Sequence, residues 1–207
     1  MNDPVISSQS QSPDATSGSS NRSVILYTII AIGIALFVRF FVAAPYIVSG
    51  SSMEPNFFDW HYLIVDRVTY DFSNPQRGDV IVLNLPEDTS RALIKRVIGL
   101  PGETIVLDFN SVTIINKDHP KGFFLKEPYL DPARLGGATN MTIVLKQGEY
   151  FVLGDNRKVS ADSRLWGTLP RKDIVGRVFV RLYPFDEIGI LPAESRYNES
   201  VTSTSGL

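Results

Sequence analysis

A long apolar stretch near the N-terminus constrains this chain most. Residues 24–38 carry no charged side chain, and beyond Arg39 the apolar residues continue to Ala44, directly before Pro45. As a helix, residues 24–44 would extend about 31 Å, enough to cross the hydrocarbon core of a bilayer. A chain of 207 residues has too little protein to surround such a helix. We therefore expect one transmembrane anchor over residues 24–44.

A cleavable signal peptide is the main alternative for this segment. The small residues Ala43 and Ala44 suit a cleavage site. However, the apolar stretch is longer than the hydrophobic region of a signal peptide, and Pro45 follows with no amide hydrogen. We favour an uncleaved anchor. Residues 1–23 are rich in Ser, Asn, Gln and Asp, so they cannot bury enough surface to order themselves and are predicted to be a disordered tail.

The rest of the chain has the pattern of a mainly β protein. Short runs of Val, Ile, Leu and aromatic residues alternate with Gly, Pro, Asn and Asp, which predicts a compact all-β domain over residues 45–192. Residues 108–110 are predicted to form a hairpin turn, residues 117–140 an irregular excursion, and residues 193–207 a flexible tail. The expected strands are 62–65, 79–83, 93–98, 104–107, 112–115, 141–145, 150–153 and 175–182.

Composition excludes several classes of function. The formal charge of −2 argues against a nucleic-acid partner, because phosphate binding needs a concentrated basic face. The absence of cysteine excludes disulfides and thiolate metal sites. Only His61 and His119 are present, which argues against a zinc site built on histidines. We expect neither a metal nor a cofactor.

Two side chains stand in segments that suggest chemistry. Ser52 lies in a polar loop between Gly50 and Pro55, and Lys95 lies within an apolar, strand-like run. A serine hydroxyl is a weak nucleophile until a base removes its proton. A lysine can act as that base only when neutral, and burial among apolar side chains favours the neutral form. The pair indicates a serine hydrolase that works without histidine.

A third informative segment, residues 148–167, runs from an apolar strand into a loop dense with polar groups. It contains Ser160, and Asp162 and Arg164 are placed to brace the loop as an ion pair. Such a concentration of polar side chains indicates a partly buried hydrogen-bonded network.

Four segments, residues 50–55, 77–82, 95–102 and 148–167, resemble motifs of the type I signal peptidases and occur in the family's order. The resemblance extends from about Arg39 to Pro184. Members of that family are membrane-anchored Ser/Lys endopeptidases that remove signal peptides from exported proteins. The resemblance implies a single-pass protein with its catalytic domain on the extracytoplasmic face, in the plasma membrane or alternatively the thylakoid. It also implies signal peptides of preproteins and membrane lipid as partners, with the translocation machinery as a further candidate.

The resemblance also assigns roles by position. Ser52 becomes the nucleophile, Lys95 the general base, Ser160 the residue that orients the amine, and Asp162 and Arg164 the supporting pair. One departure concerns the oxyanion hole: some members have a serine two positions before the nucleophile, where this chain has glycine, so a second donor must come from elsewhere. The glycine at that place is Gly50, and the expected substrate-pocket residues are Val48, Met53 and Ile94.

Other interpretations remain open at this stage. A self-cleaving regulator would use the same Ser/Lys pair but would carry a DNA-binding domain in place of the anchor. A non-catalytic scaffold for export clients and a peptidase with a narrow client list are further alternatives. A Ser-His-Asp site through either histidine has no convincing sequence context. The aromatic residues around His61 suit either a packed core or a surface resting on lipid; they are Phe57, Phe58, Trp60 and Tyr62.

Overall fold

The computed structural model describes residues 18–37, 42–86, 88–109, 111–137, 140–193, 195 and 197. The chain divides into two compact units, residues 1–38 and residues 39–207. The first unit contains one helix, α1 (Gly18–Phe37), within its described residues. Across the described ranges, no helix combines the length and the apolar character needed to cross a bilayer.

The structure corrects the predicted bounds of the anchor at both ends. Helix α1 begins at Gly18, inside the segment predicted to be a disordered tail. Residues 43 and 44, predicted to end the anchor, instead begin strand β1 (Ala43–Ile47) and pair with Asp66 and Val65. Apolar character alone does not show where a helix ends and a buried strand begins, which explains the error. The remaining parts of these predictions, residues 1–17 and 38–41, lie outside the described residues.

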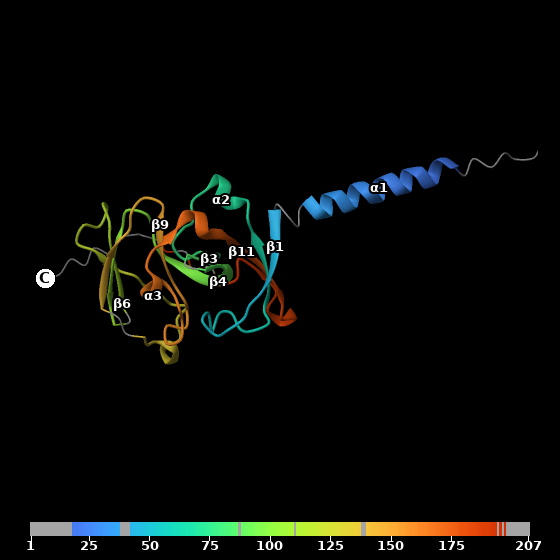
Figure 1. The fold of residues 1–207 in the computed structure, drawn as a ribbon. Helices are drawn as coiled ribbons and strands as arrows, with labels where there is room; N and C mark the ends of the chain where they lie inside the picture. The colour runs from blue at the N-terminus through green and yellow to red at the C-terminus, as the bar shows by residue number, and fades with distance from the viewer. Residues whose placement is uncertain are drawn as a thin grey trace, which may run out of the picture. The chain divides into compact units, whose positions relative to one another are not determined.

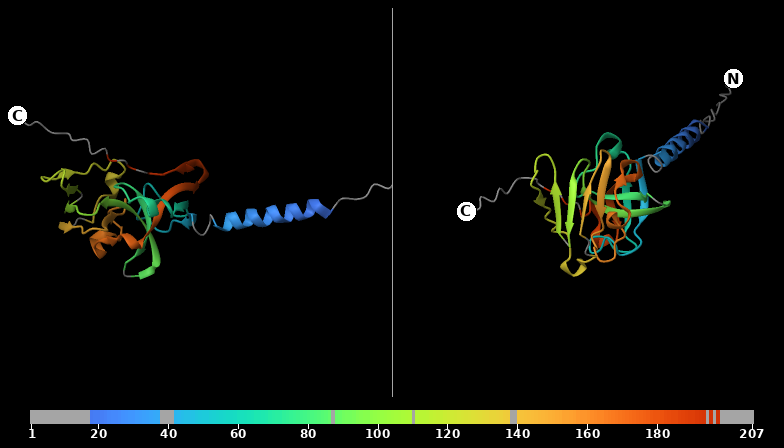
Figure 2. Two further views of the ribbon diagram at one scale, coloured as in Figure 1. Left: turned by 90° about the horizontal axis from the view of Figure 1, so that it is seen from above. Right: turned by 60° about the vertical axis from the view of Figure 1, so that its left-hand side comes forward.

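The second unit is built from two antiparallel sheets, which Figures 1 and 2 show beside each other. The larger sheet has the order β1-β2-β11-β3-β4-β9-β10, with β12 paired to β11, and the smaller has the order β7-β6-β5-β8. The larger sheet adds β2 (Tyr62–Asp66), β3 (Val80–Leu85), β4 (Asp88–Gly99), β9 (Glu149–Leu153), β10 (Leu169–Pro170), β11 (Ile174–Tyr183) and β12 (Gly189–Ile190) to β1. The smaller sheet contains β5 (Thr104–Asp108), β6 (Ser111–Ile115), β7 (Phe123–Phe124) and β8 (Met141–Val144).

Every strand predicted from the sequence is present, and most ends differ by one or two residues. The exception is β4, which begins at Asp88, five residues before the predicted start. The predicted hairpin joins β5 to β6, where Asp108 pairs with Ser111. Strands β7, β10 and β12 were not predicted because two residues are too few to show an alternating pattern. The predicted irregular excursion contains β7 and the 3₁₀ turn η2 (Pro132–Arg134). Within the described residues, the further helical segments are α2 (Thr69–Phe72), α3 (Ser163–Trp166), η3 (Arg171–Asp173) and η4 (Phe185–Glu187).

Strand β4 lies at the centre of the molecule's packing. Its second half is buried and pairs with β3 on one side and β9 on the other. Ile98 of β4 belongs to the core cluster shared with β5, β6 and β9, whereas Val97 belongs to a separate cluster with β3 and β9. Because successive strand residues face opposite sides, β4 presents Lys95 and Arg96 to different surroundings. Both side chains are buried.

Part of the predicted C-terminal tail is packed. The carbonyl oxygen of Ala193 accepts a hydrogen bond of 2.6 Å from Arg96 Nη1. Tyr197 packs against the cluster between the sheets, and burial raises the pKa of its phenol to about 12. The prediction of a flexible tail from residue 193 is therefore wrong at these two residues. Residues 194, 196 and 198–207 lie outside the described residues.

Candidate active site

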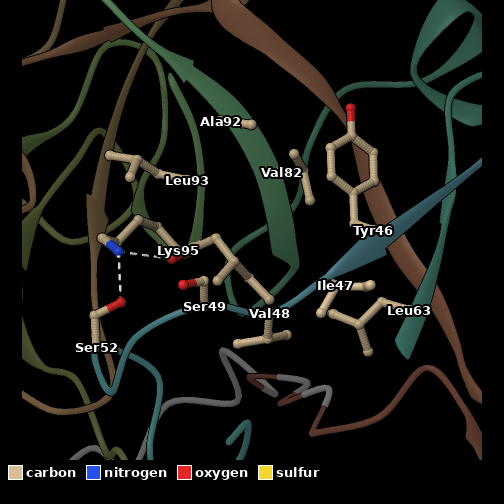
Figure 3. Close-up of a pocket in the computed structure, with 11 residues that line it drawn as sticks. Tyr46, Ile47, Val48, Ser49, Ser52, Leu63, Val82, Ala92, Leu93 and Lys95 are labelled. Carbon is tan, nitrogen blue, oxygen red and sulfur yellow. Dashed lines mark hydrogen bonds between the residues drawn. The ribbon is translucent and has the colours of Figure 1, made fainter. Parts of the chain in front are cut away.

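A pocket of about 100 Å³ opens beside strand β4 and contains both residues singled out from the sequence (Figure 3). Its polar end holds the hydroxyl of Ser52 and the amine of Lys95, whereas most of its wall is apolar. The walls come from β1 and the loop after it, from β2 and β3, and from β4. The lining residues are Tyr46, Ile47, Val48, Ser49, Ser52, Leu63, Val82, Ala92, Leu93, Ile94 and Lys95.

The loop that carries Ser52 is held by hydrogen bonds on both sides of the serine. Gly50 adopts φ +94°, a conformation that favours glycine, and its amide donates to Asp59 Oδ1. Beyond Ser52, the fully buried Met53 places its carbonyl to accept from the amide of Phe57 at 3.0 Å. The carbonyl of Ser52 itself accepts from the amide of Asn156 at 3.0 Å. These contacts fix the backbone, so the Ser52 hydroxyl has a defined position at the pocket.

Lys95 reaches the same place from the middle of β4. Its side chain is 2% exposed, and Nζ lies 2.9 Å from Ser52 Oγ and 2.7 Å from the carbonyl oxygen of Ile94. Burial lowers the pKa of Lys95 from 10.5 to about 8, against an opposing effect from the carboxylates of Asp162 and Asp155. Near pH 8, half of the molecules therefore hold a neutral amine within hydrogen-bond distance of a serine hydroxyl.

Ser160 lies close to this pair but does not make the expected contact. Its hydroxyl is buried and has no hydrogen-bond partner among the described residues. The amine of Lys95 donates to Ser52 and Ile94, and the predicted hydrogen bond between Ser160 and this amine is absent from the described residues. Gly154 lets Ser160 pack close to the backbone of Ser52, because it has no side chain. A Cβ at this position would lie 2.2 Å from Ser160 Oγ and 2.5 Å from the carbonyl oxygen of Ser52.

The expected ion pair between Asp162 and Arg164 is present and stabilises the loop after β9. Arg164 Nε and Nη2 donate to the two carboxylate oxygens at 2.8 and 2.9 Å. Asp162 also caps helix α3 and accepts from the amide of Gly154 at 3.0 Å. Arg164 continues to the carbonyl of Arg157 at 2.9 Å. The pair thereby fixes the loop on which Ser160 stands.

A second charged network behind the site was not assigned a role from the sequence. Arg96 forms a two-point ion pair with Asp155 at 2.8 and 2.6 Å, with both side chains almost fully buried. Asp155 Oδ2 also accepts from Asn56 Nδ2 at 2.8 Å, and Arg96 lies 3.9 Å from the ring centroid of Tyr129. This network joins the nucleophile loop to the loop after β9. The run Gly-Asp-Asn-Arg at 154–157 was the available signal, but sequence spacing does not reveal the partner on β4.

Two of the three residues predicted to line the pocket do so, and the third lies in the core. Val48 and Ile94 line the pocket, whereas Met53 is fully buried in the core beneath the loop. Met53 was predicted to line the pocket because it follows Ser52, but its side chain turns inward and packs with the cluster that includes Phe57. Met53 therefore supports the loop from below.

The aromatic residues near the site differ in how exposed their side chains are. Phe57 and His61 are buried, whereas Trp60 is 73% exposed and Phe58 is 38% exposed. Core packing, one of the two alternatives raised from the sequence, therefore holds for Phe57 and His61. Contact of the exposed Trp60 and Phe58 with lipid stays a prediction. Within the described part of the chain, neither histidine forms a hydrogen bond to Ser52, and burial lowers the pKa of His61. Among the described residues, no cluster of three or more His, Cys, Asp or Glu could hold a metal ion.

A serine hydroxyl beside a partly neutral amine, at the polar end of a small apolar pocket, is an arrangement suited to nucleophilic attack on a carbonyl carbon. Comparison with known proteins agrees with this chemistry. Residues 21–183 match the family described as signal peptidase, peptidase S26.

Relatives with curated names support the same assignment. The chain is 38% identical over 171 residues to "Probable signal peptidase I-1" of Synechocystis, covering 78% of this chain and 82% of that protein. It is 36% identical to "Signal peptidase I" of Leptolyngbya laminosa (81% and 82% covered) and 32% identical to "Signal peptidase IB" of Staphylococcus aureus (80% and 93% covered). The chain therefore belongs to the signal peptidase family, peptidase S26, and is a serine peptidase of the signal peptidase I type, which acts on the signal peptides of preproteins.

Proposed function

We propose that the chain is a membrane-anchored serine endopeptidase in which Ser52 is the nucleophile and Lys95 the general base. The observation that carries this proposal is the 2.9 Å separation of Lys95 Nζ and Ser52 Oγ, together with the burial that lowers the pKa of Lys95 to about 8. A base works best when its pKa lies near the working pH, and a free lysine at 10.5 would be almost entirely protonated.

The reaction follows from these two groups. Neutral Lys95 accepts the Ser52 proton as Oγ bonds to the scissile carbonyl carbon, and the carbonyl π electrons move to oxygen. The ammonium then gives its proton to the departing nitrogen as the C–N bond breaks, which leaves an acyl-enzyme. A water molecule, deprotonated by the same amine, hydrolyses the ester and restores both side chains.

The supporting residues position this pair. The Asp162–Arg164 ion pair fixes the loop of Ser160, and Ser160 holds an unpartnered hydroxyl near the backbone of Ser52. In this proposal, the buried and unpartnered hydroxyl of Ser160 orients the amine by a hydrogen bond during turnover. Their contribution is therefore to the direction of the Lys95 amine rather than to bond making.

The pocket favours apolar side chains near the scissile bond. Its wall is mostly apolar and includes Val48 and Ile94, so an apolar side chain would lie there without losing hydrogen bonds. An extended peptide laid beside a strand edge would place alternate side chains in the wall. This suits the end of a signal peptide, where the residues before the cut are small.

The apolar segment that begins at Val24 supplies the proposed attachment to the bilayer, with the catalytic unit on the extracytoplasmic face. Its support is the uncharged composition of residues 24–38 and the family's action on exported preproteins. Membrane lipid is then a partner, and translocation machinery is a further one. Carbonate extraction of the full chain, compared with a form beginning at residue 42, tests the attachment: only the full chain should remain with the membrane fraction.

The catalytic proposal is tested with purified full-length protein and a preprotein substrate. Ser52→Ala and Lys95→Ala should each abolish cleavage, while Ser51→Ala and Lys172→Met, at exposed neighbouring and remote positions, should retain it. Circular dichroism shows whether each variant is folded. Cleavage by a folded Ser52→Ala variant would refute the proposal. Sequencing the N-terminus of the product also separates a peptidase from a non-catalytic scaffold or a self-cleaving regulator.

A further inference from the structure

The backbone around Ser52 supplies one hydrogen-bond donor for an oxyanion. The Ser52 amide has no acceptor among the described residues, so it is free to donate to a developing negative charge. The amide of Gly50 is already committed to Asp59 Oδ1, and Gly50 has no side chain to contribute. A tetrahedral intermediate is best stabilised when two or more preorganised donors reach its oxygen. The site therefore lacks a second donor unless a nearby hydroxyl supplies it.

The serine hydroxyls near the site differ in where they lie. Ser160 is buried behind the pocket against Gly154, and Ser51 does not line the pocket. Ser49 does line it, together with Ser52 and Lys95. Its hydroxyl points toward the side of the pocket that holds those two residues (Figure 3).

The hydroxyl of Ser49 is free to donate a hydrogen bond, and hydrogen bonds of the neighbouring residues fix the backbone of Ser49. No hydrogen bond engages the Ser49 side chain within the described part of the chain. Directly before it, Val48 exchanges two backbone hydrogen bonds of 3.0 Å, donating to His61 and accepting from Trp60. Directly after it, Gly50 is tied to Asp59. A donor fixed on both sides loses little freedom when a substrate binds, which is what preorganised stabilisation requires.

We propose that Ser49 is a catalytic residue whose hydroxyl donates the second hydrogen bond to the oxyanion formed on the scissile carbonyl, beside the amide of Ser52. The hydroxyl donates a hydrogen bond and keeps its proton. The proton of Ser52 still passes to Lys95, so the bond changes are those of the proposed peptidase reaction. This role rests on that proposed function, because it needs Ser52 to be the nucleophile.

The test compares Ser49→Ala, Ser49→Thr and Ser51→Ala in the full-length protein. Ser49→Ala should lower kcat by about 10- to 100-fold, with little change in KM. This loss is no larger than is usual for one oxyanion donor, because Ser49 is exposed and water can take the place of its hydroxyl. Ser49→Thr keeps the hydroxyl and should recover most of the rate. Ser51→Ala, the adjacent exposed serine, should behave as wild type.

A second measurement separates oxyanion binding from a structural effect. A peptide aldehyde forms a tetrahedral adduct with the nucleophile, so Ser49→Ala should weaken its inhibition by about the same factor as kcat. Binding of an uncleavable peptide of the same sequence should be unchanged. Unaltered kcat, or an equal loss for both ligands, would overturn the role of Ser49. Activity in Ser52→Ala would instead overturn the proposed function itself, so the two failures can be told apart.

Discussion

Replacing the buried amine should make the protein inactive but more stable. Lys95 is 2% exposed, and its pKa is held at about 8 instead of 10.5. At pH 7 the amine is charged in both folded and unfolded chains, and keeping that charge buried costs about 3 kcal/mol. Lys95→Met removes this cost but leaves the Ile94 carbonyl without its 2.7 Å donor, a loss of about 1–2 kcal/mol. The net expectation at pH 7 is a gain of about 1–2 kcal/mol in unfolding free energy.

The low pKa of Lys95 also predicts how the stability difference between the two proteins changes with pH. Between pH 8 and 10.5 the unfolded chain binds more protons at Lys95 than the folded chain does, so wild-type stability rises with pH in that window. Lys95→Met lacks this dependence. The advantage of the variant should therefore shrink by about 2 kcal/mol between pH 7 and pH 9.5.

Urea unfolding followed by circular dichroism at both pH values measures these differences. Lys172→Met, at an exposed lysine, serves as the control and should show no such pH-dependent gap from wild type. A Lys95→Met variant that is less stable than wild type at pH 7, or a gap that does not change with pH, would refute the argument that burial keeps the amine's pKa low.

Three further substitutions probe the surroundings of the pair. Gly154→Ala would place a methyl group 2.2 Å from Ser160 Oγ, so kcat should fall at least tenfold in a protein that still folds; normal turnover would contradict the close packing. Arg96→Met leaves the carboxylate of Asp155 buried without its partner, and urea unfolding should show a loss of about 3–5 kcal/mol, whereas a neutral result would mean that the network is dispensable. Ala92→Leu adds bulk to the pocket wall, so cleavage should become restricted to smaller side chains at the cut; an unchanged substrate profile would place the specificity elsewhere.

Much of the fold was accessible from local patterns, because strands such as β5 and β6 alternate buried and partly buried positions over five residues each. Strand β1 was missed because its apolar residues continue the preceding apolar stretch, and only its partner β2 shows it to be a strand. Whether a run of apolar residues forms a helix or a strand depends on such tertiary partners.

The contacts of the site could likewise be predicted only in part from the sequence. The motifs predicted that Ser52 and Lys95 meet, and they do at 2.9 Å. They could not show that Arg96 pairs with Asp155 or that Met53 packs inward, because those contacts depend on how β4 and the loop after β9 come together. Ser160 was expected to bond the amine, yet its hydroxyl has no partner among the described residues. Motif spacing identifies participants, whereas side-chain direction is decided by packing.

The proposed mechanism requires that a neutral Lys95 amine removes the proton of Ser52. The direct measurement is the titration of the Lys95 side chain by ¹³C NMR of its ε-carbon, compared with the pH dependence of kcat/KM for preprotein cleavage. Both curves should have their midpoint near pH 8, with activity rising as the amine becomes neutral. A Lys95 that titrates above pH 10, or an activity profile whose midpoint does not follow it, would contradict the proposed Ser/Lys mechanism.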